Sequence, residues 1–266
     1  MDEIWQYEQE ALAAGYTAVC GCDEAGAGPL AGPVYAAAVI LAPGTELPGL
    51  NDSKKLTEKK REALFPVIQE KALSWAVAWV DAEEIDRTDI LSARMKAMQL
   101  AIDRLNPTAD FALIDGNRDR GRSAAIITEH RMIVKGDSLS ASIAAASILA
   151  KVSRDHWMVR AAEFLRRKGY RIIASGWRCR FGELDLVAEG GEFLCFIEVK
   201  LRGSERFGTG AEQVDRRKQE RLRTTAELYL QQHPSPLQPR FDVVEILAPQ
   251  GMATKRPGIR QIENAF

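Results

Sequence analysis

Four acidic residues stand at places where predicted strands or a helix begin or end. They are Asp23 and Glu24 after an apolar strand over 17–22, Asp115 after a strand over 111–114, and Asp137 before a helix over 138–151. Carboxylate oxygens are the ligands that hard divalent cations prefer. Two such ions roughly 4 Å apart would activate a water and stabilise a leaving 3′-oxygen in phosphodiester cleavage.

Adjacent residues of a strand point to opposite faces of its sheet. Asp23 and Glu24 therefore converge on one site only if the strand ends between them, and the glycines that follow supply such a turn. Simpler roles stay open for each acid. Asp115-Gly116 is typical of a turn, Asp137-Ser138 of a helix N-cap, and Asp-Glu before glycines of a solvated loop.

A second group of charged residues lies on two neighbouring predicted strands. Glu183 and Asp185 alternate with apolar residues in GELDL, and Glu198 and Lys200 alternate in FIEVK. A hairpin of these strands would bring Asp185, Glu198 and Lys200 together, so that two carboxylates hold a metal and a lysine steadies phosphate charge. An ordinary polar face of a two-stranded sheet is the alternative.

The elements that would carry these residues alternate between strand and helix, which is typical of layered α/β domains. Strands are expected over 17–22, 34–41, 73–80, 111–114, 125–134, 171–179, 183–188, 193–200, 241–247 and 259–262, and helices over 90–105, 138–151, 160–168 and 211–232. No helix-breaking residue stands between Lys151 and Gly169, so the two halves share one helix or a short join. We place the boundary near Trp157.

The balance of acidic and basic residues also changes near Trp157. Residues 1–157 carry 17 Lys and Arg against 23 Asp and Glu, whereas residues 158–266 carry 19 against 14. An acidic half binds a polyanion poorly unless metal ions lie between them, and a basic half is a plausible nucleic-acid binder. Within 213–230, Arg216, Arg217, Lys218, Arg221 and Arg223 could face DNA phosphates, or could form a solvated face with the acids between them.

Composition narrows the class of protein. Hydrophobic residues make up 46% and charged residues 27% of 266 residues, which excludes disordered and collagen-like chains. Four cysteines are too few for a disulfide scaffold, and with three histidines a zinc site is not expected. The acidic start has the wrong sign for a signal peptide, and glycines and prolines interrupt the uncharged stretch 25–45. We expect a cytoplasmic protein with no membrane partner.

Residues 1–157 resemble bacterial ribonuclease HII. The resemblance rests on CGCDEAGAGPLAGPVYAAAVIL, NDSKKL, LIDGN and VKGDSLSASIAAASILAKVSRD, in that order along the chain. It implies a ribonuclease H-like fold and cleavage of the RNA strand of RNA–DNA hybrids, including single embedded ribonucleotides, with Mn²⁺ or Mg²⁺. It also implies that Asp23, Glu24, Asp115 and Asp137 are the catalytic, metal-binding carboxylates.

The same resemblance implies nucleic-acid contacts from the glycine-rich loop at Gly26, Ala27 and Gly28, and from Lys54 and Lys151. Two departures stand out. Ala27 replaces the arginine of the family's Gly-Arg-Gly, which removes a guanidinium–phosphate contact and not the backbone groups. After Asp155 the family's tyrosine-bearing segment and closing helices are absent, so the resemblance does not extend to the tyrosine implied to stack at the RNA–DNA junction.

Residues 161–266 resemble the YraN family, on GYRIIASGWRCRFGELDLVAEGGEFLCFIEVKLR, RFDVVEI and the final ENAF. The core of that family resembles restriction-endonuclease and Holliday-junction-resolvase nucleases. The implied metal residues are Asp185 and Glu198, with Lys200 catalytic. Met158 stands where the family has a further glutamate, so this half lacks the additional metal-associated acid of the family.

We therefore expect an α/β chain of two domains: a ribonuclease H-like mixed sheet with flanking helices over 1–157, and a small restriction-endonuclease-like α/β domain over 158–266. Three functions follow. The favoured one is a two-metal ribonuclease acting on RNA–DNA hybrids. The others are a catalytically impaired nucleic-acid-binding fusion, and cleavage of branched or duplex DNA through Asp185, Glu198 and Lys200. The sequence leaves the oligomeric state open.

Overall fold

The protein is described here from a computed structural model, which covers residues 3–26, 33–202, 216–248, 254 and 256–266. The described residues form two compact units, the first lying mostly within 3–154 and the second mostly within 155–266. The nucleic-acid-binding residues expected at Ala27 and Gly28 lie outside the described residues.

The first unit contains five strands and several helices. The strands are β1 (Val19–Ala25), β2 (Val34–Ile40), β3 (Ser74–Val80), β4 (Phe111–Asp115) and β5 (His130–Ile133). The helices are α1 (Gln6–Ala13), α2 (Glu58–Lys71), α3 (Ala82–Arg87), α4 (Ile90–Asp103) and α5 (Ala141–Arg167), with short 3-10 turns at Glu3–Trp5 and Gly136–Ser138. The part of α5 from Asp155 on belongs to the second unit.

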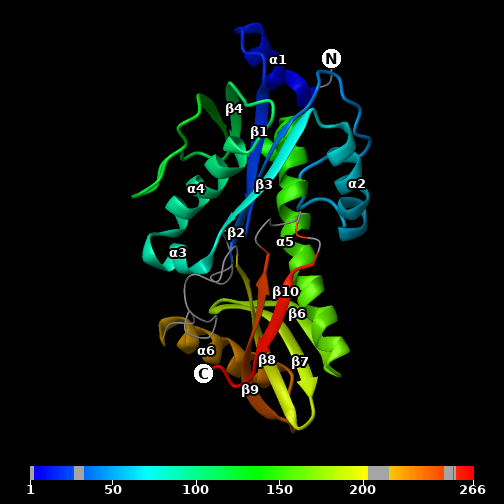
Figure 1. The fold of residues 1–266 in the computed structure, drawn as a ribbon, viewed down its shortest axis with the longest axis vertical. Coiled ribbons are helices and arrows are strands. Elements are labelled where there is room, and N and C mark those ends of the chain that lie inside the picture. Colours follow the sequence, from blue (N-terminus) through cyan, green and yellow to red (C-terminus); the bar gives the residue numbers. More distant parts are fainter. Residues whose placement is uncertain (1–2, 27–32, 203–215, 249–253, 255) are drawn as a thin grey trace. The chain divides into compact units, whose positions relative to one another are not determined.

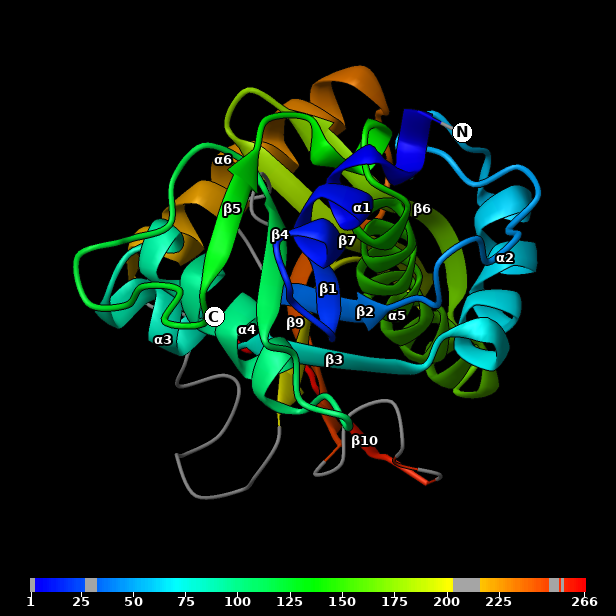
Figure 2. The same cartoon turned by 90° about the horizontal axis from the view of Figure 1, so that it is seen from above.

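The five strands form one sheet in the order β3-β2-β1-β4-β5 (Figure 2). β1, β2 and β3 pair antiparallel, whereas β1, β4 and β5 pair parallel. The expected mixed sheet with flanking helices is thus confirmed. The carboxyl ends of β1 and β4 meet at the same edge, because the two strands run side by side in the same direction.

Helices cover both faces of this sheet, with α4 on one side and α5 on the other (Figure 1). Along β1 the faces alternate: Cys20 and Cys22 pack in one apolar cluster with α4, whereas Val19 packs in another with Ile143 of α5. The intervening Gly21 is where α5 comes closest. A Cβ built on Gly21 would lie 2.2 Å from Ile143 N and 2.5 Å from Ser142 Oγ.

Small side chains allow this close packing. β2 carries three consecutive alanines, Ala36, Ala37 and Ala38, all fully buried, and the start of α5 is rich in buried alanine and serine. With small side chains between helix and sheet, the packing is stabilised by dense van der Waals contact between closely spaced backbones rather than by the burial of large side chains.

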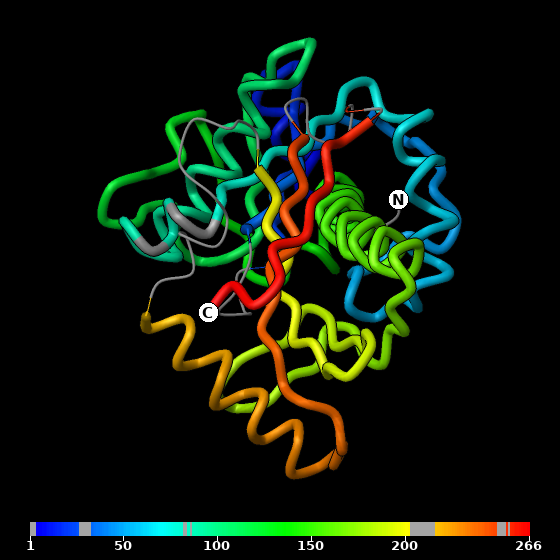
Figure 3. The backbone as a smooth tube through the Cα atoms, turned by 60° about the horizontal axis from the view of Figure 1, so that its bottom comes forward, coloured from blue at the N-terminus to red at the C-terminus, as the bar shows by residue number. Residues whose placement is uncertain are grey.

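The second unit is built on another five-stranded sheet, in the order β10-β9-β8-β7-β6. Its strands are β6 (Arg171–Cys179), β7 (Gly182–Gly190), β8 (Phe193–Arg202), β9 (Gln238–Leu247) and β10 (Gly258–Ile262). Among the strands described in this sheet, β8 and β9 pair parallel, with helix α6 (Arg216–Gln232) between them in the chain, and the other pairs are antiparallel. Figure 3 traces this order from the yellow strands through the orange helix to the red C-terminal strand.

The helix α6 packs on this sheet through one stripe of buried residues. Leu222, Ala226 and Tyr229 share an apolar cluster with Leu194 and Phe196 of β8. These positions recur at helical spacing, as expected for a helix with one face on a sheet.

Several boundaries differ from the sequence-based expectation. The strand expected over 125–134 is limited to β5, and the helices expected over 138–151 and 160–168 are one helix, α5, that begins at Ala141. The strand expected to end at residue 22 continues through Asp23 and Glu24 to Ala25, because its pairing with β2 continues to Tyr35. The charged, weakly periodic helices α1, α2 and α3 were not expected.

Within the described residues, none of the helices combines the length and the apolar character that crossing a membrane requires.

The packing at Gly21 gives a direct test of the fold. We expect Gly21→Ala to destabilise the protein by about 3 kcal/mol, because the added methyl meets α5 backbone that cannot rotate away. Gly258→Ala is the control, since its Cβ would meet only Leu247 Cβ at 3.7 Å. Urea unfolding of both variants measures the difference, and equal stability of the two would contradict this account of the packing.

Candidate functional site

The end of β1 separates the two acids that the sequence places next to each other. Asp23 is 3% exposed and forms a side-chain hydrogen bond with Ser147 of α5, whereas Glu24 pairs with Arg94 of α4. The strand continues to Ala25, so the chain turn expected between the two residues is absent, although the charge of Glu24 still acts on Asp23. Asp23 lies on the α5 face of the sheet and Glu24 turns towards α4, as strand alternation requires.

Asp115 lies beside Asp23 at the end of the neighbouring strand. The parallel register pairs Cys22 with Ile114, so Asp23 and Asp115 occupy equivalent positions on the same face. Asp115 Oδ1 accepts a hydrogen bond from Gly136 N at 2.7 Å. This bond ties the end of β4 to the turn that carries Asp137.

Asp137 occupies a 3-10 turn, Gly136–Ser138, that precedes α5. The turn is set up by Lys135, whose φ of 59° lies in the left-handed region. The helix-cap interpretation of Asp137 is wrong, because α5 starts three residues beyond this turn and Glu8 Oε1 of α1 accepts from Ser142 N at 2.9 Å. Asp137 instead forms a side-chain hydrogen bond with Asp52.

The acids interact with one another electrostatically. Burial, followed by the charges of Glu24 and Asp115, raises the pKa of Asp23 well above its usual range. Burial, followed by the charges of Asp115 and Asp52, raises the pKa of Asp137 to about 6. Burial also raises the pKa of Glu24, although Arg94 opposes this shift. The group therefore holds more negative charge than its own surroundings neutralise.

Two cations adjoin the acids from different sides. Arg94 Nη2 lies 2.6 Å from Glu24 Oε1, and both side chains are largely buried. Lys54 Nζ lies 3.8 Å from Asp137 Oδ2, and its side chain is 80% exposed. Burial disfavours the charged form of Lys54, but the carboxylates of Asp23 and Asp137 outweigh this effect and raise its pKa.

The other basic and glycine positions lie close in the chain to these groups. Lys151 is half-buried on α5, four residues after Ser147, and therefore on the same helix face as the serine that bonds to Asp23. Gly26 follows β1 with a φ of 96°, a conformation that favours glycine.

The donor chemistry of this cluster suits Mg²⁺ or Mn²⁺. All the candidate ligands are carboxylates, and Glu24 Oε2 is buried with no hydrogen-bond partner. Mutual repulsion between buried acids is what a bound cation relieves. As the side chains stand in the described part of the chain, no three His, Cys, Asp or Glu groups are placed to hold one ion.

Three contributors to this cluster were not singled out from the sequence. Asp52 stands in the NDSKKL motif, where an acid two residues before Lys54 is a visible signal. Ser147, whose Oγ lies 2.7 Å from Ser53 Oγ, and Arg94 carry no signal, because each is one residue in an otherwise regular helix.

The second unit brings its expected charged residues together. Asp185 Oδ2 accepts from Val199 N at 2.9 Å, which joins β7 to β8 next to Glu198. Lys200 Nζ lies 3.5 Å from Glu198 Oε1, and Lys218 of α6 also donates to that oxygen. Asp185, Glu198, Lys200 and Lys218 are all at most 6% exposed.

The charges of this second cluster compensate one another. Burial opposes ionisation of Glu198, but Lys218 and Lys200 lower its pKa. Burial, followed by the charge of Lys218, lowers the pKa of Lys200 to about 8. The interpretation of the basic helix as a wholly solvated or DNA-facing surface is therefore wrong for Lys218, which points into the unit.

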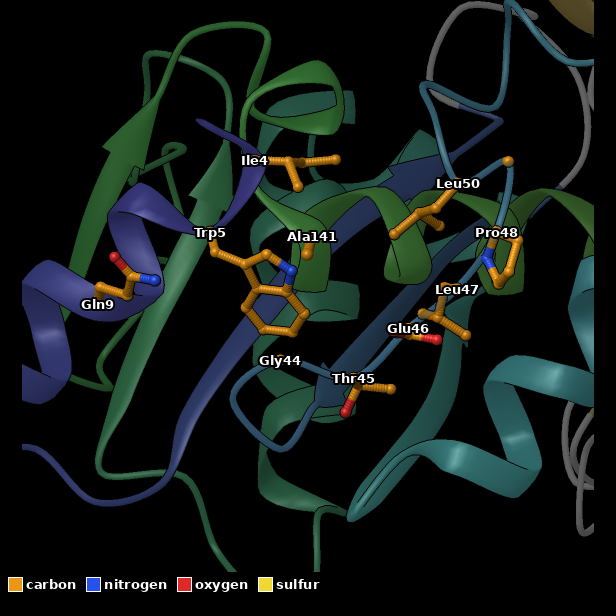
Figure 4. A pocket seen from close by; sticks show the side chains of 11 residues that line it. Ile4, Trp5, Gln9, Gly44, Thr45, Glu46, Leu47, Pro48, Leu50 and Ala141 are labelled. Atoms are coloured by element: carbon orange, nitrogen blue, oxygen red, sulfur yellow. The ribbon is translucent and has the colours of Figure 1, made fainter. Parts of the chain in front are cut away.

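A hollow elsewhere in the first unit has a volume of about 530 Å³. It is lined mainly by residues near the N-terminus and by the 44–50 loop, among them Trp5, Leu47 and Pro48 (Figure 4). None of the clustered acids lines it, so it is separate from the acidic site.

Comparison with known proteins supports both resemblances. A family model of ribonuclease HII matches residues 20–176, and that of the uncharacterised protein family UPF0102, the YraN family, matches residues 159–246. Ribonuclease HII of Dechloromonas aromatica (strain RCB) is 58% identical over 141 residues, which cover 53% of this chain and 70% of that protein. Ribonuclease HII of Ruminiclostridium cellulolyticum is 50% identical over 155 residues, which cover 58% and 59%.

Among solved structures, the ribonuclease H2 from Pyrococcus horikoshii OT3 is 27% identical, with a TM-score of 0.46 over 57% of this chain and 77% of that one. The chain spans 59% to 70% of the length of the two curated relatives. Because the ribonuclease HII model covers more than half of its residues, the chain belongs to the ribonuclease HII family.

Proposed function

We propose that the first unit is a metal-dependent endoribonuclease that cleaves the RNA strand of RNA–DNA hybrids, including duplexes with single embedded ribonucleotides. Asp23, Glu24, Asp115 and Asp137 would hold Mn²⁺ or Mg²⁺. The observation that carries the proposal is the meeting of three carboxyls. Asp23 and Asp115 stand at the carboxyl ends of adjacent parallel strands, and the turn that carries Asp137 is bonded to Asp115 through Gly136 N.

Bound divalent ions would activate a water molecule and stabilise the negative charge that develops on the leaving 3′-oxygen. The protein supplies the positions of the ligands. The bond from Gly136 N fixes Asp115, and the bond to Ser147 fixes Asp23. Arg94 holds Glu24 against α4.

The basic residues would bind the nucleic acid from the exposed side. The ammonium of Lys54 is exposed yet lies next to Asp137, so a phosphate can approach it while remaining close to the carboxylates. Gly26 follows the end of β1 and has no side chain, so a substrate backbone could come close to the acids there.

Catalysis should depend on Asp115. Asp115→Asn should slow cleavage of a duplex with one ribonucleotide at least about 100-fold in Mn²⁺ and in Mg²⁺, because it removes a charged ligand. Products from the unchanged chain should end in a 3′-hydroxyl. Gel analysis of labelled duplex measures both, with Asp103→Asn, a surface acid that bonds to Gln99, as the control.

Two outcomes would overturn the proposal. One is an Asp115→Asn variant that cuts as fast as the unchanged chain. The other is an unchanged chain that binds hybrid duplex in a filter assay but cuts it in neither metal.

Without metal, the repulsion between the acids should lower the stability of the protein. In EDTA, Asp137→Asn should melt about 2–4 °C above the unchanged chain at pH 7, the shift that roughly 1 kcal/mol gives in a protein of this size. The folded pKa of Asp137, about 6, exceeds its ordinary value of 3.8. The advantage should therefore be absent near pH 3.8, grow as pH rises to 6, and stay constant above it.

Added Mn²⁺ should raise the melting temperature of the unchanged chain and leave that of Asp137→Asn nearly unaltered. The control is Asp110→Asn, which should lower the melting temperature at pH 7. Although burial opposes ionisation of Asp110, hydrogen bonds from Thr17 and Ala18 lower its pKa. If the unchanged chain is more stable than Asp137→Asn in EDTA, the acids do not repel one another as described.

A further inference from the structure

The row of buried side chains on α6 begins with a charged residue, Lys218. Lys218 precedes Leu222, Ala226 and Tyr229 on the helix face that packs on the sheet, and it is 6% exposed. The facing strand β8 also changes from apolar to charged side chains. Leu194 and Phe196 are followed on the same strand face by Glu198 and Lys200. The apolar interface between α6 and β8 thus ends in a set of buried charges.

These charges balance within the set. Asp185 and Glu198 contribute two negative charges, and Lys200 and Lys218 contribute two positive ones. Glu198 Oε1 accepts from Lys218 and lies 3.5 Å from Lys200, while Glu198 Oε2 is buried with no hydrogen-bond partner. A carboxylate that is 1% exposed must be paired, and here the lysines of the same unit provide the pairing.

A divalent cation does not fit this set as it stands. It would add two positive charges to buried groups that are already neutral together, and the cost of burying uncompensated charge is several kcal/mol per ion. The oxygen that could ligate it best, Glu198 Oε1, is engaged by Lys218.

We propose that Lys218 is the internal counter-cation of the second unit, standing in the place that a divalent ion would take between Asp185 and Glu198. With Lys218 charged and in place, the unit has a closed ion cluster that takes no divalent ion. Removing this one charge leaves two carboxylates against one lysine, and both oxygens of Glu198 become available to a hard cation such as Mn²⁺. The inference goes beyond the function proposed for the first unit and does not depend on it.

The test measures Mn²⁺ binding to the full chain with Asp23→Asn and Asp115→Asn, so that the acids of the first unit do not contribute. The electron paramagnetic resonance signal of free Mn²⁺ gives the bound fraction, and melting temperature with and without Mn²⁺ gives a second readout. In this background we expect the second unit to bind no Mn²⁺ at free concentrations up to about 1 mM, which corresponds to a binding free energy weaker than about 4 kcal/mol. Lys218→Met should bind one Mn²⁺ at least about tenfold more tightly than this limit of about 1 mM, and its melting temperature should rise when Mn²⁺ is added.

Arg217→Met is the matched control, because it removes one positive charge from the neighbouring, exposed position of α6. It should behave like the background. Adding Glu198→Gln to Lys218→Met should abolish the new site, which assigns the ion to this cluster.

Three results would overturn the proposal. The background chain could already bind a Mn²⁺ that Glu198→Gln removes, which would mean that the ion displaces Lys218. A folded Lys218→Met could bind none. If Lys218→Met does not fold, Lys218→Gln retains a hydrogen-bond donor without the charge, and its failure to bind Mn²⁺ or to be stabilised by it would equally contradict the proposal.

Discussion

Buried carboxyl groups of like charge are the constraint on which the first unit depends. Gathering Asp23, Asp115 and Asp137 opposes folding, because Asp23 and Asp137 lose hydration and both meet the charge of Asp115. The remainder of the unit compensates with dense packing. Fully buried alanines on β2 and α5 and the close approach at Gly21 bring helix and sheet together without strain in large side chains.

The two units treat buried acids in opposite ways. In the first, the cations lie at the edge of the cluster: Lys54 is mostly exposed and Arg94 pairs with Glu24, and the pKa values of Asp23 and Asp137 stay raised in spite of Lys54. In the second, Lys200 and Lys218 lie inside the cluster and balance it. An excess of negative charge is costly for stability and useful for holding metal, whereas a balanced cluster fixes the position of α6 on its sheet and leaves little affinity for an added ion.

Most of the fold could be predicted because its elements have strong periodic signals. The strands β2, β3 and β8 and the helix α4 lie within one or two residues of their expected bounds, since apolar runs and helical spacing decide them locally. The separation of Asp23 from Glu24 could not be predicted, because it depends on how far β2 extends the ladder of β1. The pairing of Arg94 and of Lys218 with a buried acid could not be predicted from the sequence either. Each is one basic residue among several on a helix, and only tertiary packing decides which of them is buried against an acid.

The helix α5 has a consequence for dividing this chain. A cut at residue 157 falls inside α5, ten residues before its end at Arg167. The helix ends later, where Gly169 has a φ of 90° and Tyr170 N donates a hydrogen bond to Leu165 O at 3.0 Å. The two family matches overlap over the same stretch, residues 159–176. The part of this shared stretch up to Arg167 belongs to one continuous helix, so a cut that separates the two matches would also interrupt that helix.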